Sequence, residues 1–254
     1  MSLIKEFQAG KLTVKAYSTK EDMGKAAAIL AAEAINKVIA EKGECNVIFA
    51  AAPSQDEFLE NLISIPVNFG AVNAFHMDEY IGLPSDAPQG FGNFLKRGIF
   101  DKVDFKSVNY IIGNNDPKEE CERYSALLKA NPVDVVCMGI GENGHIAFND
   151  PHVAFFDDKE VIKVVDLDEK CRNQQVNDGC FSEIGKVPTH ALTLTIPTLV
   201  SARNIYCMVP RATKAEAVFN TVNGGITEEC PSTILKNHDN AIMFIDSDSG
   251  SRVI

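Results

Sequence analysis

The sequence lacks several features that mark other classes of protein. Its seven cysteines form no CxxC pair, so neither a zinc ribbon nor a disulfide framework is indicated. No apolar run reaches membrane-spanning length, and the first residues lack the apolar core of a signal peptide. The formal net charge of −11 argues against a surface for nucleic acid or anionic membrane, which needs clustered Lys and Arg. These absences favour a cytoplasmic protein with neither a nucleic-acid nor a membrane partner.

The composition is typical of a folded globular protein. The chain has 254 residues, of which 45% are hydrophobic and 23% are charged. This length suffices for one large α/β domain with a substantial core. Because no linker, repeat or low-complexity tract interrupts the chain, we expect a single domain over residues 1–254.

The hydrophobic pattern alternates between strands and helices. The five clearest predicted strands cover residues 11–17, 46–52, 133–139, 204–209 and 241–246. Helical spacing predicts helices over residues 20–41, 117–130 and 211–222, and Ser18 with Glu21 forms a capping-box signature before the first. Near-continuous apolar strands are typical of a parallel sheet covered on both faces. The predicted fold is therefore a three-layer αβα sandwich with a mostly parallel, Rossmann-like sheet, in which ligands bind at the carboxyl ends of strands.

Two adjacent acids end one predicted strand, in the segment FHMDEY at residues 75–80. The side chains of Asp78 and Glu79 must point to opposite faces, so only one of them can face a given pocket. Residues 82–92 are rich in glycine and proline, as expected of a mobile loop that covers a pocket. The alternative is that one acid merely caps the end of the strand.

A glycine-rich segment, GIGENGHIAFND at residues 139–150, follows another predicted strand. It contains GxGxxG, but a dinucleotide site needs a helix to begin at the third glycine, and here Asn149-Asp150-Pro151 indicates a turn instead. The segment presents Asn143, His145 and Asp150 close together. A histidine beside a carboxylate has the equipment to move a proton on a sugar oxygen. A purely structural hydrogen bond is the alternative role of His145.

Metal binding has little support in the sequence. His76, Asp78, His145 and Asp150 could act as ligands, but HxxxH and HxH pairs and loops of alternating acids do not occur. We therefore predict no catalytic metal.

The segments FHMDEYIGLP (75–84) and GIGENGHIAFNDP (139–151) together resemble the glucosamine-6-phosphate deaminase/isomerase family. The resemblance extends through VPTHALTLTIPTL (187–199), RATKAEAV (211–218) and CPSTILKNH (230–238), and so covers nearly the whole chain. It implies conversion of a phosphorylated amino sugar to a ketose 6-phosphate and ammonia, without a metal or organic cofactor. Relatives include monomers and hexamers, so a homo-oligomer is compatible with it.

The resemblance also implies roles for individual residues. Asp78 matches the base that moves a proton from C2 to C1, and His145 matches the histidine that opens the sugar ring. Asp150 stands where the family usually has Glu, and Asn143 stands where Asp is frequent. Asn143 cannot ionise, so its expected role is to orient His145 or the substrate. Lys214 matches a lysine that holds the phosphate.

Two segments depart from the family pattern, and both belong to substrate anchoring. The family's phosphate loop is roughly Thr-Gly-Gly-Thr-Pro, whereas this chain has Ala52-Pro53-Ser54-Gln55, in which proline removes a backbone donor. We expect Ser54 and Gln55 to bind the phosphate with their side chains, at the start of a helix. The segment at 171–181 lacks the family's Asn-x-Arg-Phe-Phe, and Arg172 is the candidate for the missing guanidinium.

Three alternatives to glucosamine-6-phosphate deamination remain from the sequence. The altered loop leaves galactosamine 6-phosphate as a second candidate substrate. A 6-phosphogluconolactonase shares the fold and a similar GH turn, but Tyr80 follows Glu79 here where those lactonases typically have Arg. A non-catalytic sugar-phosphate sensor would retain the pocket without turnover.

Overall fold

The structure is a computed structural model that describes residues 2–254. Its eleven strands are β1 (Leu3–Ala9), β2 (Leu12–Tyr17), β3 (Cys45–Phe49), β4 (Val72–His76), β5 (Asp78–Tyr80), β6 (Ser107–Asn109), β7 (Val135–Met138), β8 (Ile162–Asp166), β9 (His190–Leu194), β10 (Asn204–Val209) and β11 (Ala241–Ile245). Its seven α-helices are α1 (Lys20–Lys42), α2 (Asp56–Leu62), α3 (Phe91–Leu95), α4 (Pro117–Ala130), α5 (Glu169–Asn177), α6 (Ile196–Val200) and α7 (Ala215–Asn223). Each of the strands and helices predicted from the pattern is present.

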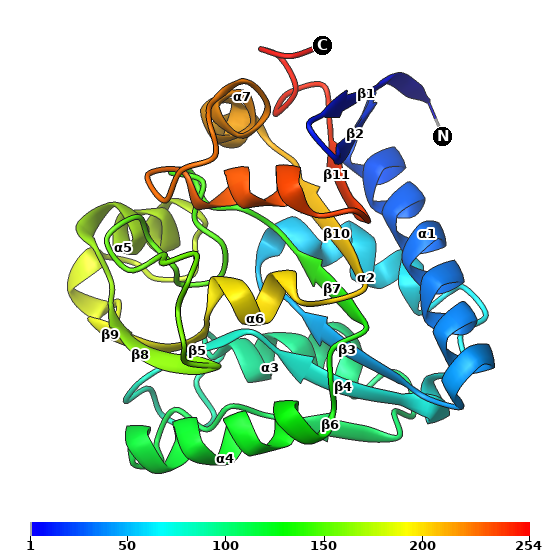
Figure 1. Cartoon of the computed structure of the whole chain (residues 1–254). Helices are drawn as coiled ribbons and strands as arrows, with labels where there is room; N and C mark the ends of the chain where they lie inside the picture. The colour runs from blue at the N-terminus through cyan, green and yellow to red at the C-terminus, as the bar shows by residue number, and fades with distance from the viewer. Residues whose placement is uncertain (1) are drawn as a thin grey trace.

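The main sheet has eight strands in the order β1-β2-β11-β10-β7-β3-β4-β6. Every pairing in it is parallel except that of β1 with β2. Helices cover both faces, with α1 and α2 on one side and α4 and α6 on the other (Figure 1). The predicted three-layer αβα sandwich with a mostly parallel sheet is confirmed.

Alternation along the central strands builds two hydrophobic cores, one on each face of the sheet. On β3, Val47 and Phe49 pack with the buried residues of α1, whereas Ile48 packs into the opposite core. Five alanines of α1 are buried, which lets this helix lie close against the sheet. Such two-sided burial is the reason that the strands are almost continuously apolar.

The N-cap of the first helix lies one residue later than predicted. Thr19, rather than Ser18, is the N-cap, and its hydroxyl accepts a hydrogen bond from the amide of Asp22 at 3.1 Å. Ser18 instead bonds through its hydroxyl to that of Ser2 at 2.9 Å. The predicted capping box is therefore wrong, because Ser18 is engaged by the N-terminal strand before the helix begins.

The predicted strand at 75–80 is divided between two sheets. β4 ends at His76, and the chain then leaves the main sheet, where the carbonyl of Met77 accepts a hydrogen bond from the amide of Leu194 at 2.8 Å. β5 continues as the edge of a small antiparallel sheet with the order β5-β9-β8. Asp78 therefore stands on a different sheet from the strand that delivers it.

The chain reverses its direction across the main sheet between β3 and β7. β4 and β6 lie on one side of β3, whereas β7, β10 and β11 lie on the other. The loops that follow β3 and β7 therefore diverge at the carboxyl ends of these two strands, which is where open α/β sheets bind ligands. In the described residues, 2–254, no helix is long and apolar enough to cross a membrane.

Candidate active site

One cavity lies at this switch point and contains most of the predicted site residues. Its lining includes Asp78, His145, Lys214, Ser54 and Gln55. These residues come from the segments that follow β3, β7 and β10, and from β5, which follows β4. The carboxyl edge of the sheet thus brings together side chains that are distant in the sequence.

Asp78 and Glu79 serve different structures, as their adjacent positions on a strand require. Asp78 lines the cavity, whereas the carboxylate of Glu79 accepts hydrogen bonds from the amides of Tyr80, Phe91 and Gly92 at 2.9–3.0 Å. Glu79 thereby fixes the start of α3 and the end of the loop at residues 81–90. Asp78 is left as the acid that faces the cavity.

The environment of Asp78 makes it a stronger base than an ordinary carboxylate. Burial, followed by the charge of neighbouring Glu79, raises its pKa well above the usual 3.8. Its backbone is held by His76, whose Nδ1 donates to the carbonyl of Asp78 at 3.0 Å while its Nε2 accepts from the amide of Ile111 at 2.9 Å. Burial lowers the pKa of His76 to about 4, so this imidazole is neutral. His76 is a positioning residue and offers no free nitrogen to a metal.

The glycine-rich segment after β7 is a compact turn, and no helix begins at Gly144. The amide of Gly141 donates to the carbonyl of His145 at 2.9 Å, and Gly144 has φ of 83°. A Cβ at Gly141 would lie 2.1 Å from Cε1 of His145, so only glycine lets the imidazole lie across this backbone. Rejection of the dinucleotide motif is confirmed, because the glycines here seat a histidine.

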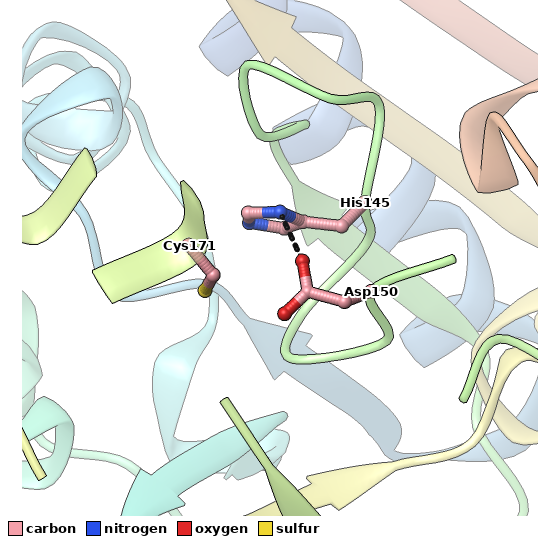
Figure 2. A group of neighbouring side chains, drawn as sticks. All are labelled: His145, Asp150 and Cys171. Carbon is pink, nitrogen blue, oxygen red and sulfur yellow. Dashed lines mark ion pairs between the residues drawn. The ribbon is translucent and has the colours of Figure 1, made fainter. Parts of the chain in front are cut away.

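A buried ion pair orients His145. Its Nδ1 lies 3.1 Å from Oδ1 of Asp150 (Figure 2). The same oxygen accepts a hydrogen bond from Nδ2 of Asn143 at 3.0 Å. The Oδ1 of Asn143 in turn accepts from the amide of His145 at 3.1 Å. Nδ1 is close to the carboxylate without the alignment of a full hydrogen bond, so a small rotation of the ring would complete it. Asn143 therefore orients both members of the pair.

Asp150 is fully buried, and its carboxylate nevertheless favours the deprotonated form. Burial alone would raise its pKa, but the charge of His145 and hydrogen bonding within the cluster outweigh burial, and the net pKa is lowered. A deprotonated Asp150 therefore lies beside the imidazole of His145. The pair is thus suited to a histidine that accepts a proton and returns it.

Cys171 of α5 completes a group of three possible metal ligands. The ligand atoms of His145, Asp150 and Cys171 lie within 4.8 Å of one another, and all three residues are buried (Figure 2). Nitrogen, oxygen and thiolate donors together suit zinc. This set differs from the one considered from the sequence, since it includes a cysteine and excludes His76 and Asp78.

Two cationic side chains from the segment after β10 face the same cavity. Lys214 is 5% exposed, and burial lowers its pKa, although the charges of Asp178 and Glu142 act in the opposite direction. No hydrogen bond or ion pair reaches its ammonium group within residues 2–254, so it is available to an anion. Arg211 lines the cavity beside it.

The candidate anchor at Arg172 is not in the cavity. Its guanidinium donates to the carbonyls of Ile184 and Val187 at 2.8 and 3.0 Å, and so holds the loop between α5 and β9. Gln174 and Gln175 of α5, and Asp178 directly after it, line the cavity instead. Arg172 therefore lies outside the cavity that Asp78 and His145 line, and its guanidinium has backbone partners instead.

The predicted start of a helix at residues 52–55 is confirmed. Pro53–Gln55 forms a single 3₁₀ turn that continues into α2. Both Ser54 and Gln55 line the cavity, where Nε2 of Gln55 donates to Oγ of Ser54 at 3.1 Å. The buried Oε1 of Gln55 has no hydrogen-bond partner in the described chain.

Other resembling segments support the site from behind. The amide of Ser232 donates to the carbonyl of Gly144 at 2.8 Å, and Oγ1 of Thr193 accepts from the amide of Phe148 at 3.1 Å. The segments CPSTILKNH and VPTHALTLTIPTL therefore hold the turn that carries His145. Arg211, Gln174, Gln175 and Asp178 were not predicted, although Arg211 could have been noticed as a cation two residues after a buried strand.

The fold and this cavity define an α/β protein with an acid–base site at the switch point of its sheet. The chain belongs to the glucosamine-6-phosphate isomerase/6-phosphogluconolactonase family, whose model matches residues 18–244.

Known relatives place the chain nearer to one branch of that family. It is 36% identical to a glucosamine-6-phosphate deaminase of Exiguobacterium sibiricum, over 71% of this chain and 70% of the relative. A glucosamine-6-phosphate deaminase of Bacillus cytotoxicus is 34% identical, over 85% and 80% of the two chains. A solved structure of a monomeric glucosamine-6-phosphate deaminase superposes with a TM-score of 0.86 at 30% identity, covering 94% and 98%. A 6-phosphogluconolactonase of Thermotoga maritima gives a TM-score of 0.75 at 15% identity, covering 92% and 99%, which is a likeness of fold.

Proposed function

We propose that this protein converts glucosamine 6-phosphate to a ketose 6-phosphate and ammonia. The observation that carries the proposal is the presence of Asp78 and His145 in one cavity that also contains Lys214. A carboxylate base, a histidine with a carboxylate partner and an unpaired ammonium are the groups that this reaction requires. The deaminases that the chain matches at 34–36% identity support the same assignment.

Ring opening is assigned to His145. The imidazole accepts the proton of the O1 hydroxyl and delivers a proton to the ring oxygen O5, so the C1–O5 bond breaks and C1 becomes an aldehyde. The lowered pKa of Asp150 keeps a negative charge beside the imidazolium that forms transiently. Asn143 holds the two groups in register through its two hydrogen bonds.

Isomerisation is assigned to Asp78. Its carboxylate removes the proton from C2 of the open-chain sugar and returns it to C1, which moves the carbonyl oxidation level to C2. The resulting imine at C2 reacts with water, and ammonia leaves as the ketone forms. A base with a raised pKa holds the proton long enough to return it to the neighbouring carbon.

Binding of the phosphate is assigned to the opposite end of the cavity. Lys214 supplies a positive charge, and Ser54 and Gln55 supply neutral donors from the turn after β3. A substrate seated there would place its sugar ring toward Asp78 and His145. The seven cysteines are all free thiols, which accords with the reducing cytoplasm that we infer as the place of action.

Direct assay tests this proposal. The purified protein is incubated separately with glucosamine 6-phosphate, galactosamine 6-phosphate and 6-phosphogluconolactone, and ammonia, ketose phosphate and lactone hydrolysis are measured. We expect ammonia and ketose phosphate in equal amounts from glucosamine 6-phosphate. Ammonia from galactosamine 6-phosphate alone would change the sugar, and lactone hydrolysis alone would change the reaction. Tight binding of the amino-sugar phosphate without ammonia would indicate a sensor.

A further inference from the structure

The turn after β3, at the end of the cavity to which we assign the phosphate, lacks one backbone hydrogen-bond donor; we call this the gap. Pro53 has no amide hydrogen, so this turn has one backbone donor fewer than a turn without proline. Arg172 on α5 does not fill this gap, because its guanidinium donates to the carbonyls of Ile184 and Val187 outside the cavity. A doubly charged phosphate would then meet only Lys214 as a full positive charge, unless another cation compensates.

Arg211 lies at this gap on a strained backbone. Its φ of 85° falls in the left-handed region, which a residue with a Cβ rarely adopts. The conformation is held by Asp246, whose Oδ2 accepts the amide hydrogen of Arg211 at 3.0 Å, and Asp246 is itself fixed by the amide of Ser249 at 2.8 Å. Strain that surrounding groups maintain at a cavity is a signal of function.

The guanidinium of Arg211 is poorly satisfied inside the protein. Nη1 lies 3.4 Å from Oδ1 of Asp178, and Nη2 lies 3.4 Å from the carbonyl oxygen of Pro53. Both separations exceed those of ordinary N–H···O bonds, and a guanidinium has five N–H donors. Most of its donor capacity is therefore open to the cavity that it lines.

We propose that Arg211 is the phosphate anchor of this protein, with Asp178 as its counter-ion while the site is empty. The proposal rests on the proposed function, since it names the residue that holds the substrate's phosphate. On binding, two phosphate oxygens replace Oδ1 of Asp178 on the guanidinium fork, while Lys214 contacts the phosphate as a point charge. Nη2 of Arg211 lies 3.4 Å from the carbonyl oxygen of Pro53, so the guanidinium stands beside the turn that lacks this amide donor.

Substitution by glycine separates binding from folding. Glycine adopts a φ of 85° without strain, so the Tm of R211G should be at or above that of the wild type. The same variant loses the guanidinium and should bind phosphate more weakly. A merely structural arginine would show the reverse pattern, with Tm falling and binding unchanged.

The matched experiment compares R211A with R97A. Arg97 lines the neighbouring hollow, where Nη2 donates to the carbonyl of Pro88 at 2.8 Å, and it does not line the cavity of Asp78. Calorimetry measures the affinity of each variant for glucosamine 6-phosphate and for inorganic phosphate. We expect R211A and R211G to weaken both by about 10- to 100-fold, the loss of a charged hydrogen-bond pair, and R97A to leave both within about twofold. D178N, which removes the competing anion, should tighten phosphate binding several-fold.

The outcomes distinguish this proposal from the proposed function. If the wild-type protein binds glucosamine 6-phosphate and releases no ammonia, the deaminase assignment fails while weaker binding by R211A still supports the anchor. Affinity in R211A and R211G equal to that of the wild type overturns the anchor whether or not the protein is a deaminase. Weaker binding in R97A instead of R211A also overturns it, since the phosphate would then lie in the neighbouring hollow.

Discussion

Nδ1 of His145 lies 3.1 Å from Oδ1 of Asp150, and both side chains are buried beside the cavity that Asp78 lines. The ion pair links His145, to which we assign ring opening, to a carboxylate that does not line the cavity. If His145 acts through this pair, removing the charge of Asp150 should slow ring opening and leave the later proton transfer intact.

D150N tests that separation. We expect kcat for glucosamine 6-phosphate to fall by about 10²-fold, a typical contribution of general acid–base catalysis. Because ring opening would become limiting, the isotope effect of substrate deuterated at C2 should fall toward unity. An unchanged isotope effect together with the lower kcat would contradict the assignment of Asp150 to ring opening.

G141A tests the seat of the imidazole. A Cβ at residue 141 would lie 2.1–2.3 Å from three ring atoms of His145, so the ring has to leave its present position. We expect turnover to fall by at least about 10²-fold, since misplacing a catalytic group by about 1 Å has that effect. G185A is the control, because a Cβ there would meet no atom within 4 Å. Turnover in G141A near that of G185A would show that His145 is not the reacting histidine.

The raised pKa of Asp78 predicts the acid side of the pH profile. Asp78 is a base only when deprotonated, so kcat/KM should fall on acidification at a pH well above 3.8. The folded protein binds this proton more tightly than the unfolded chain, so the associated stability is present at low pH and is lost as pH rises through the folded pKa.

The substitution D78N should restore the stability that the wild type loses as pH rises, and it should abolish exchange of the C2 proton with solvent. Its Tm should exceed that of the wild type at about pH 8 and approach it at about pH 4, where Asp78 is protonated. Melting curves at both values measure the difference. A constant difference in Tm across this range would contradict the raised pKa, and persistent C2 exchange would show that another residue is the base.

E79Q should affect the loop and spare the chemistry. The carboxylate of Glu79 accepts three backbone amides, whereas an amide side chain offers one oxygen. We expect a lower Tm and faster proteolysis within residues 81–90, with C2 exchange still detectable. If E79Q lost all exchange of the C2 proton while D78N kept it, Glu79 and not Asp78 would be the base.

Zinc should inhibit the enzyme by occupying the group formed by His145, Asp150 and Cys171. The three ligand atoms lie within 4.8 Å of one another, and a bound metal would take the imidazole away from ring opening. We expect a chelator to leave activity unchanged and C171S to weaken zinc inhibition by about tenfold or more, relative to C207S as a buried-cysteine control. Loss of activity on chelation would overturn the cofactor-free mechanism.

The sequence alone determined where the main strands and helices lie along the chain, because apolar periodicity reports directly on which side chains are buried. It also predicted that Asp78 and His145 lie together, since polar residues after parallel strands meet at one sheet edge, and both line the same cavity. The departure at Pro53 was visible for the same local reason, as proline lacks an amide hydrogen whatever the fold.

Only the tertiary structure decided which arginine faces the cavity. Arg172 and Arg211 are equally cationic in sequence, but the turn of α5 directs the first to the carbonyls of Ile184 and Val187. The left-handed φ of Arg211 and its contacts with Asp178 and Pro53 depend on elements that are distant along the chain. No local pattern records such contacts, because they arise when β3, β10 and α5 meet at the switch point of the sheet.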